Sequence, residues 1–453
     1  MFISCGVVVA PASEPSPLNE KHSLPSFPLQ VSASGRYLVD QKQMPFFING
    51  DSPWEILWRL SKEEAKAYLE TRQQQGFNAI LVDVLPFTER RDPSKQANRD
   101  GQFPFETPGD FSTPNEKYFA HLDWLVRTAA DKGFLVMLVP CDLGAGNPGM
   151  WYPFVKQNGV AKCYRYGKYL GNRYRNYPNI LWVLGGDRDP GDVTEHVRAI
   201  AQGLKEAAPN QLRTYHPSGG KLNSSAVFFH EEDWLDINLA YTPGATYIPT
   251  YQNYRRTPIK PTFLAESAYE GERRGWVDEK QPVLVGQERE LVKPQRVRRQ
   301  AYWAMLAGSC GHMYGSRLWD FPVGWKNDMD MPGARHMRHL RQLFESYPWF
   351  RLVPDHEHQI VIDGYESGPT LATTAALPDG SLAITYLPSK RTITVALNQF
   401  KGPVMAKWMD PTSGVFTLLG KAPLANTGRR PFTPPERNAD GDADFILVLE
   451  IAR

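Results

Sequence analysis

The chain has 453 residues, more than one domain usually holds, and its 42% apolar and 22% charged residues are typical of a soluble globular protein. The 51 basic and 49 acidic side chains leave a net charge of +2, so the composition gives no reason to expect nucleic acid or a membrane surface as a partner. No apolar run is long enough to predict a transmembrane segment, and the four cysteines show neither zinc-ligand spacing nor a disulfide framework.

The first 30 residues predict an N-terminal arm. The start of the chain, MFISCGVVVAPASEP, has a short apolar segment that ends in small residues, as a signal peptide does. Residues 11–30 are rich in Pro and Ser. The positively charged residues that begin a signal peptide are missing, so the stretch resembles a clipped signal peptide. The residues before Cys5 fit a lipid-anchor site poorly. We expect export, with the protein secreted or periplasmic.

Strands and helices alternate from residue 31 onward. Ser61 and Glu64 form a capping box that opens the helix Lys62–Gln75, and Gly76 ends it. The other expected elements are strands at Ser34–Asp40, Pro45–Asn49, Phe77–Val84, Phe134–Pro140, Ile180–Leu184, Leu212–Tyr215, Trp234–Leu239, Pro261–Ala265 and Ser309–Tyr314, and helices at Glu116–Lys132, Lys156–Tyr174, Thr194–Ala208, Val292–Ala307 and Arg335–Glu345. About eight strands that alternate with helices predict the α/β class, with a (β/α)₈ TIM barrel over residues 31–352. The polar excursion Pro86–Pro114 is long for a barrel loop, which favours a functional role.

The sequence pattern changes after Pro354, where short expected strands follow one another without a helical pattern. The expected strands are Gln359–Asp363, Leu371–Ala375, Leu382–Leu387, Thr392–Ala396, Val404–Met409, Val415–Leu419 and Phe445–Leu449. Turn sequences such as Pro378-Asp379-Gly380 separate them. Residues 353–453 are therefore predicted to form a C-terminal all-β sandwich. Pro348, Trp349, Phe350 and Leu352 at the junction predict an apolar interface with the barrel.

Two acidic residues stand at the ends of buried strands. The segment Asn179–Pro190 reads NILWVLGGDRDP, so Asp187 follows a short apolar strand and two glycines. The segment PTFLAESAY places Glu266 at the end of another strand. Because the carboxyl ends of barrel strands share one face, two carboxylates there suit glycoside hydrolysis, which needs one acid with a raised pKa and one ionised carboxylate. The alternatives are a helix-capping Asp187, and an ion pair of Glu266 with Arg273 or Arg274.

Other polar and aromatic residues at strand ends are candidates for substrate binding. They are Asp51, Trp54, Asp83, Asp142, His216, Tyr241, Tyr314 and Trp319. Asp51 and Asp83 suit hydrogen bonds to sugar hydroxyls, with loop capping as the alternative. Trp54 and Trp319 suit stacking on sugar rings, with packing at the barrel rim as the alternative. His216 is either a donor to substrate or a structural residue.

Other chemistries find little support in the sequence. No nucleophile elbow, phosphate loop or Asp-rich calcium loop is present. His336 and His339 lie on one expected helix without the rest of a zinc motif, so they are interpreted as surface residues. Cys141 and Cys310 end apolar strands and are expected to be buried thiols. No metal or organic cofactor is expected.

Several segments together resemble the apiosidase-like glycoside hydrolases, glycoside hydrolase family 140. They are FFINGDSPWEILWRLSKEEAKAYLETRQQQGFNAI, WVLGGDRDP, TYHP, FFHEEDWLDIN and FLAESAYEG, and AKWMDPTSGVF resembles the collagen-binding-type sandwich often fused to that family. The resemblance implies a clan of retaining glycosidases with the acid/base at strand 4, here Asp187, and the nucleophile at strand 7, here Glu266. The larger clan usually shows Asn-Glu at strand 4, where this chain has Gly186-Asp187. The implied activity is similar to that of enzymes releasing apiose from branched plant pectin.

The sequence thus predicts a retaining exo-β-glycosidase that acts on side chains of plant cell-wall polysaccharide, with an oligosaccharide or polysaccharide as its partner. Asp187 and Glu266 are the expected catalytic residues. One alternative is an endo-β-glucanase or mannanase-like hydrolase, and another is a non-catalytic carbohydrate-binding protein. The sandwich is interpreted as a packed accessory domain rather than a collagen binder. The oligomeric state is open, with a monomer expected.

Overall fold

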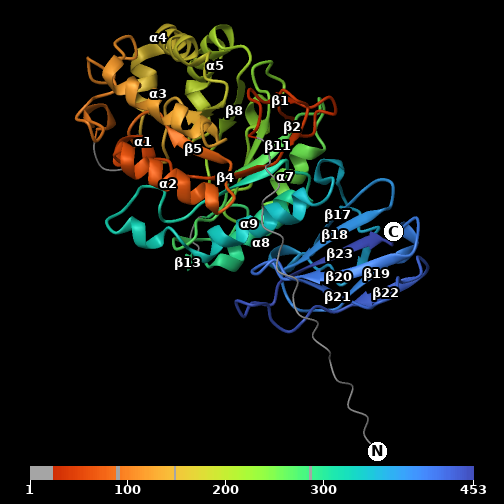
Figure 1. Cartoon of the computed structure of the whole chain (residues 1–453). Coiled ribbons are helices and arrows are strands. Elements are labelled where there is room, and N and C mark those ends of the chain that lie inside the picture. The colour runs from red at the N-terminus through yellow and green to blue at the C-terminus, as the bar shows by residue number, and fades with distance from the viewer. Residues whose placement is uncertain (1–23, 88–91, 147–148, 285–287, 453) are drawn as a thin grey trace, which may run out of the picture.

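The computed structural model of the chain describes residues 24–87, 92–146, 149–284 and 288–452. The signal-like segment and Cys5 lie outside these residues, as does part of the excursion Pro86–Pro114. Figure 1 shows a barrel of helices and strands beside a C-terminal all-β part drawn in blue. No helix in the described ranges combines the length and the apolarity that a membrane crossing requires.

A nine-stranded sheet forms the barrel, in the order β8-β7-β6-β5-β4-β14-β11-β10-β9. Its parallel strands are β4 (Ile48–Asp51), β5 (Ala79–Asp83), β6 (Leu135–Val139), β7 (Ile180–Gly185), β8 (Leu212–His216), β10 (Asn238–Tyr241), β11 (Thr262–Glu266) and β14 (Gly311–Tyr314). The short β9 (Asn223–Ser224) pairs antiparallel with β10. No strand pairing joins β8 to β10 in the described residues. The Thr214 hydroxyl of β8 nevertheless donates a hydrogen bond to the carbonyl of Ile237, the residue before β10, at 2.7 Å. The predicted (β/α)₈ class is confirmed.

Helices surround the barrel. They are α1 (Ile56–Arg59), α2 (Lys62–Gln74), α3 (Glu116–Ala130), α4 (Tyr152–Tyr174), α5 (Thr194–Ala207), α6 (Ala226–Phe229), α7 (Tyr247–Tyr254), α8 (Pro294–Leu306) and α9 (Pro332–Glu345). The capping box of α2 is confirmed, because the Ser61 hydroxyl accepts from the Glu64 amide at 3.3 Å while the Glu64 carboxylate accepts from the Ser61 amide at 3.2 Å. The expected strand Trp234–Leu239 begins only at Asn238, and α7 was not predicted.

Smaller antiparallel elements accompany the barrel. β1 (Gln30–Val31), β2 (Leu38–Val39) and β3 (Pro45–Phe46) form one sheet, and β12 (Arg273–Arg274) pairs with β13 (Glu290–Leu291) in the long loop after β11. The expected buried thiols are also confirmed, since Cys141 and Cys310 are both free and buried.

The C-terminal part is a sandwich of two antiparallel sheets. The larger has the order β15-β17-β18-β23-β20-β21 and the smaller β16-β19-β22. The strands are β15 (Val353–Pro354), β16 (Val361–Asp363), β17 (Thr373–Ala376), β18 (Leu382–Leu387), β19 (Ile393–Ala396), β20 (Val404–Met409), β21 (Phe416–Leu418), β22 (Arg429–Phe432) and β23 (Phe445–Ile451). β22 was not predicted, because its sequence RRPF has two charges and a proline where strand patterns have apolar residues.

The central strand β23 of the large sheet is buried on both faces. On β23, Phe445, Leu447 and Leu449 belong to the apolar core of the sandwich. The alternate residues Ile446 and Val448 belong to the same apolar cluster as the barrel. A strand covered on both faces has no polar alternation, which explains the continuous apolar run of this segment.

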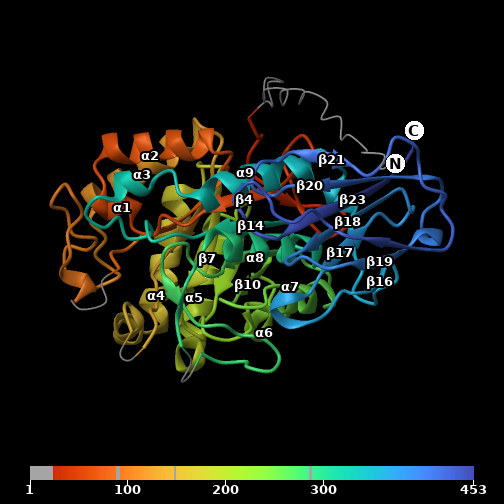
Figure 2. The ribbon, with the colours of Figure 1, turned by 90° about the horizontal axis from the view of Figure 1, so that it is seen from below.

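Helix α8 of the barrel packs against β17 and β18 of the sandwich. Figures 1 and 2 show α8 and α9 lying between the barrel strands and the blue sheet. The rings of Tyr302 and Tyr386 stack across the interface with centroids 4.9 Å apart. The Trp303 indole N–H donates to the Leu371 carbonyl at 2.9 Å. The interface is therefore largely apolar.

A buried ion pair lies inside this interface. Arg298 on α8 donates to both carboxylate oxygens of Asp444 at 2.6 and 2.7 Å, and both side chains have 0% exposure. His336 on α9 is buried beside Arg298, and its Nε2 lies 3.0 Å from Asp440. Burial and the neighbouring Arg298 charge lower the His336 pKa to about 3. The interpretation of His336 as a surface residue was wrong, because the sandwich covers this face of α9.

We expect Asp444→Asn to lower the free energy of unfolding by about 3 kcal/mol, because it removes the fully buried counterion of Arg298 and leaves only the partly exposed Asp442 to pair with it. Denaturant unfolding followed by tryptophan fluorescence measures the change. Asp330→Asn is the matched control, since Asp330 pairs with Arg335 at 2.8 Å on the exposed surface. This control should cost about 1 kcal/mol or less. Equal losses in the two variants would contradict the prediction.

Candidate active site

Two glycines shape the end of β7, where Asp187 stands. Gly185 and Gly186 have φ of +92° and +105°, a region that side chains rarely adopt. A Cβ atom on Gly186 would lie 2.4 Å from the carboxylate carbon of Asp142. The glycine therefore lets the end of β7 approach Asp142 closely. Asp187 itself has φ of +45°, a left-handed backbone that Asp adopts more readily than most residues with a side chain.

Asp187, His216 and Glu266 converge from β7, β8 and β11. One carboxylate oxygen of Asp187, one of Glu266 and one ring nitrogen of His216 lie within 4.8 Å of one another. His216 Nε2 is 3.0 Å from Glu266 Oε2, and the Tyr241 hydroxyl donates to Glu266 Oε1 at 2.9 Å. The other ring nitrogen of His216 lies 3.3 Å from the Asp187 amide nitrogen. These contacts hold the Glu266 carboxylate and the backbone of Asp187 against one imidazole ring.

The suggested ion pair between Glu266 and a neighbouring arginine is absent from the described residues. Arg274 instead pairs with Glu272, with Nη2 and Oε2 3.0 Å apart. Arg274 nevertheless lies near enough for its positive charge to lower the Asp187 pKa. The sequence pattern missed this role, because the position of a long loop after β11 leaves no periodic signal.

The site holds more buried acids than can ionise together. Burial, and then the negative charge of Glu266, raise the Asp187 pKa to about 6. Burial, and then the charge of Asp187, raise the Asp142 pKa to about 8. Burial and the charge of Asp142 raise the Asp83 pKa well above its usual range. Burial lowers the His216 pKa, but the hydrogen bond to Glu266 and the surrounding acids outweigh it, so the net shift is upward. Protonated carboxyls near neutral pH follow from this crowding.

Two of these acids have buried oxygens that bond to no other described group. Both carboxylate oxygens of Asp83 and one oxygen of Asp187 are buried without a hydrogen-bond partner in the described part of the chain. Asp142 is 4% exposed and accepts from the Gly144 amide at 2.6 Å. A buried carboxyl without a partner is costly, so Asp83 suits a ligand that brings hydroxyl groups.

Aromatic rings form one wall of the site. The Trp54 ring meets the His216 ring edge-on, with centroids 5.4 Å apart. Its indole N–H donates to the Tyr269 hydroxyl at 2.6 Å, a residue that the sequence did not single out. Trp319 is half-buried near the rim, where its N–H donates to Glu272 at 2.6 Å and its ring meets Phe87 at 5.6 Å. Trp54 thus lies beside His216 and the two carboxylates, and Trp319 lies farther out.

Trp54→Ala should lower kcat/KM about tenfold with the fold intact, because stacking area beside His216 is lost. Steady-state kinetics measures this effect. Trp54→Phe keeps one ring and loses the hydrogen bond to Tyr269 and part of the ring surface, so it should lose less activity than Trp54→Ala. Trp325→Ala, a half-buried tryptophan that packs on Tyr68, is the control and should retain activity. An unchanged kcat/KM in Trp54→Ala would make Trp54 a rim-packing residue.

Asp51 and Tyr314 do not join this centre, which corrects their predicted place among the substrate-binding residues. Asp51 forms a buried ion pair with Arg72 of α2 at 2.7 Å, and Tyr68 of the same helix also donates to it. The Tyr314 hydroxyl donates to Glu270 at 2.5 Å. Alternate strand residues point into the barrel or toward the helices, and Asp51 points toward α2.

The same three groups, Asp187, His216 and Glu266, are also close enough to ligate a cation. Their donor set is two carboxylates and an imidazole, which is chemically suited to a divalent ion. In this structure, however, the imidazole and the Tyr241 hydroxyl already engage the two Glu266 oxygens. The arrangement therefore fits a hydrogen-bonded carboxylate pair.

Comparisons with known proteins extend over both parts of the chain. Residues 32–351 match the family model described as "Apiosidase-like, catalytic domain", and residues 353–450 match the "Putative collagen-binding domain of a collagenase". A solved structure titled "Glycoside hydrolase" is 27% identical with a TM-score of 0.81, over 94% of this chain and 97% of that one. A glycoside hydrolase family 5 structure from Bacteroides vulgatus is 25% identical with a TM-score of 0.80, over 93% of each chain. A comparison with curated proteins found no match.

Proposed function

The chain belongs to the apiosidase-like family and is a glycoside hydrolase of the TIM-barrel clan, and on this premise we propose that it is a retaining exo-β-glycosidase. The proposed substrates are side chains of plant cell-wall polysaccharide. One observation carries the retaining assignment: an oxygen of Asp187 lies within 4.8 Å of an oxygen of Glu266. Retaining pairs are about 5–5.5 Å apart, whereas inverting pairs leave about 6.5–9.5 Å for a water molecule.

In the proposed reaction, Asp187 donates its proton to the glycosidic oxygen while Glu266 attacks the anomeric carbon. The glycosidic bond breaks, the leaving group departs with the proton, and the sugar forms an ester with Glu266. Asp187, now ionised, takes a proton from water, and the resulting attack on the anomeric carbon releases Glu266. A raised pKa suits Asp187 for the first step, since the group must carry a proton near neutral pH.

The hydrogen bonds around Glu266 support its role as nucleophile. Tyr241 donates to one oxygen and His216 Nε2 faces the other, so the carboxylate is held in one orientation. Positioning of this kind keeps the attacking oxygen aligned without reorganisation during the reaction. A non-catalytic carbohydrate-binding protein would need the aromatic rings of this site but not both carboxylates.

Buried acids support a sugar-binding pocket rather than an open surface. Asp83 and Asp142 are 1% and 4% exposed at the ends of neighbouring strands, where they suit the hydroxyl groups of one terminal sugar. The family supports the plant side-chain substrate. We also propose export, because such a polymer lies outside the cell that degrades it.

The sandwich is proposed to be a packed accessory domain. Residues of its large sheet, among them Ile384, Tyr386 and Ile446, share the apolar cluster of the barrel. A face that is buried against the barrel is not available to bind collagen or another partner. This role does not depend on the sugar that the enzyme releases.

Proton NMR of the first-formed sugar tests the proposed mechanism. A screen of pectin fragments and aryl glycosides identifies a substrate, and spectra taken within the first minutes show the anomer that is released before mutarotation. Retention of configuration with a monosaccharide product is the expected result. An inverted first product would mean that Glu266 is not the nucleophile, and oligosaccharide products would identify an endo-acting enzyme.

The pH dependence should differ between substrates. As the pH rises through about 6, Asp187 loses the proton that it must donate, so kcat/KM should fall for substrates with poor leaving groups. Aryl glycosides with good leaving groups need no proton and should lack this fall. Parallel pH profiles on the two substrate types measure the difference. Identical profiles would assign the titration to another group.

A further inference from the structure

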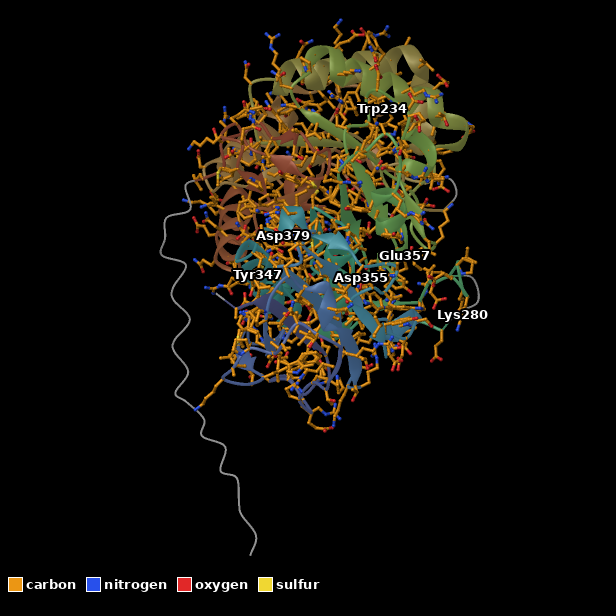
Figure 3. All side chains as sticks on the ribbon, turned by 90° about the vertical axis from the view of Figure 1, so that its right-hand side faces the viewer. Trp234, Lys280, Tyr347, Asp355, Glu357 and Asp379 are labelled. Atoms are coloured by element: carbon orange, nitrogen blue, oxygen red, sulfur yellow. The ribbon has the colours of Figure 1, made fainter. Side chains whose placement is uncertain are left out.

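A groove runs along the seam between the barrel and the sandwich. Two adjoining cavities of about 390 and 740 Å³ share Tyr247 and Tyr251 of α7, Glu279 of the loop after β11, and His356 of the sandwich. We call this region the seam groove. Figure 3 labels Asp355, which lines the smaller cavity, where the ribbons of the two parts meet. The seam groove is separate from the catalytic centre, since none of its lining residues is an acid or aromatic residue of that centre.

Stacked aromatic pairs line the seam groove. The Tyr251 ring stacks on the His356 ring across the seam, with centroids 3.9 Å apart and planes 24° apart. Within the sandwich, His358 stacks on Tyr365 with centroids 3.6 Å apart. Tyr251, His358 and Tyr365 are half-buried and His356 is exposed, so each pair retains surface toward the solvent side. Flat rings at the edge of a groove suit the C–H faces of sugar rings.

The polar groups of the seam groove suit hydroxyl groups. Thr373 is 8% exposed and lines the smaller cavity, and its hydroxyl has no hydrogen-bond partner among the residues that the structure describes. A buried hydroxyl without a partner indicates a place where a ligand supplies one. Glu279 and Glu366 add carboxylate acceptors to the same wall.

The charges of the smaller cavity of the seam groove select against acidic ligands, whereas the larger cavity has Arg255 and Arg256 beside Glu279 in its wall. The charged residues that line the smaller cavity are Glu279, Asp355 and Glu366, and no described Lys or Arg lines it. Burial lowers the His358 pKa, so this ring is neutral at pH 7. Carboxylates here would repel a uronate but accept hydrogen bonds from neutral sugars.

We propose that the seam groove is a second carbohydrate-binding site, whose smaller cavity holds a neutral segment of the polysaccharide while the catalytic centre acts elsewhere on it. Glu279 belongs to the loop that follows β11, the strand that ends at Glu266, so this loop begins at the end of the barrel where Glu266 lies. The proposal rests on the glycosidase class of the chain and not on its retaining or exo-acting mode. An inverting or endo-acting enzyme would use the groove in the same way.

Affinity electrophoresis tests the proposal without catalysis. The inactive Glu266→Gln chain is run through gels that contain arabinan, galactan or xyloglucan as neutral polymers, or polygalacturonate as the acidic one. At least one neutral polymer should retard the protein. Adding Tyr251→Ala and His356→Ala should raise the apparent dissociation constant about fivefold, because ring surface is lost. Adding Phe416→Ala, an aromatic residue 42% exposed on β21, should change nothing.

Two further measurements separate binding from folding. The milder pair Tyr251→Leu and His356→Gln should melt like the parent and still bind less tightly. In the active chain, these substitutions should leave kcat/KM on a small aryl glycoside unchanged and raise KM on the polymer. Equal retardation of all variants, retardation by polygalacturonate alone, or no retardation by any neutral polymer would overturn the proposal.

Discussion

Glu266→Gln is expected to reduce turnover by about 10⁴-fold or more on every substrate, whatever its leaving group. An amide of the same shape cannot form the glycosyl ester. The amide oxygen can still accept the hydrogen bond from Tyr241, so the pocket should keep its form. Steady-state rates on a natural fragment and on an activated aryl glycoside measure the loss.

Glu272→Gln provides the matched control for this variant. Glu272 is a neighbouring acid that bonds to Trp319 and Arg274 at the rim, so the same substitution there should cost less than about tenfold. Substrate binding by the Glu266→Gln protein, measured by calorimetry, should remain. Comparable losses in both variants would indicate a general electrostatic effect and would remove the special role of Glu266.

Asp187→Asn should have an effect that depends on the leaving group. Poor leaving groups need a proton, so their kcat/KM should fall about 10²–10⁴-fold, whereas good leaving groups should lose much less in the first step. A series of aryl glycosides with leaving groups of graded pKa measures this dependence. Asp189→Asn is the control, because Asp189 bonds to Ser218, Lys221 and Asn223 and does not face the anomeric carbon in the proposed arrangement.

Azide provides a sharper test of the same residue. In Asp187→Ala, a small anion can enter the vacated space and attack the glycosyl ester without needing a base. Added azide should restore the rate on an activated substrate and give a β-glycosyl azide. Rescue with a product of the opposite configuration would contradict the double-displacement mechanism, and rescue of the Asp189→Asn control would show that the effect is not local.

The barrel was predictable because its strands are buried on both faces and therefore appear as short apolar runs, as in Ile180–Gly185. The capping box at Ser61 was predictable because it depends on local chemistry alone. Asp187 and Glu266 followed from the rule that strand carboxyl ends meet on one face. That rule does not say on which side of a strand a residue points, so it also included Asp51, which bonds to Arg72.

Features that depend on contacts distant in sequence were not predictable. Helix α7 contains Pro249 and several aromatic residues, a composition without helical preference, and packing against α8 and β10 decides its conformation. His336 lies on a helix whose outer face would be exposed if the barrel stood alone. Arg274 reaches the site through the course of a long loop. In each case the deciding neighbour lies in another part of the chain.

The large sheet of the sandwich limits how the gene for this enzyme can change in evolution. Leu447 and Val448 are adjacent in the chain, yet each completes a different hydrophobic core. An insertion of one residue in β23 would turn both side chains to the wrong side and damage the two cores at once. The catalytic barrel therefore cannot be transferred on its own to another accessory domain without exposing part of its core. Recombination that separates it from the sandwich would deliver a barrel with an open apolar flank, and selection should keep the pair together.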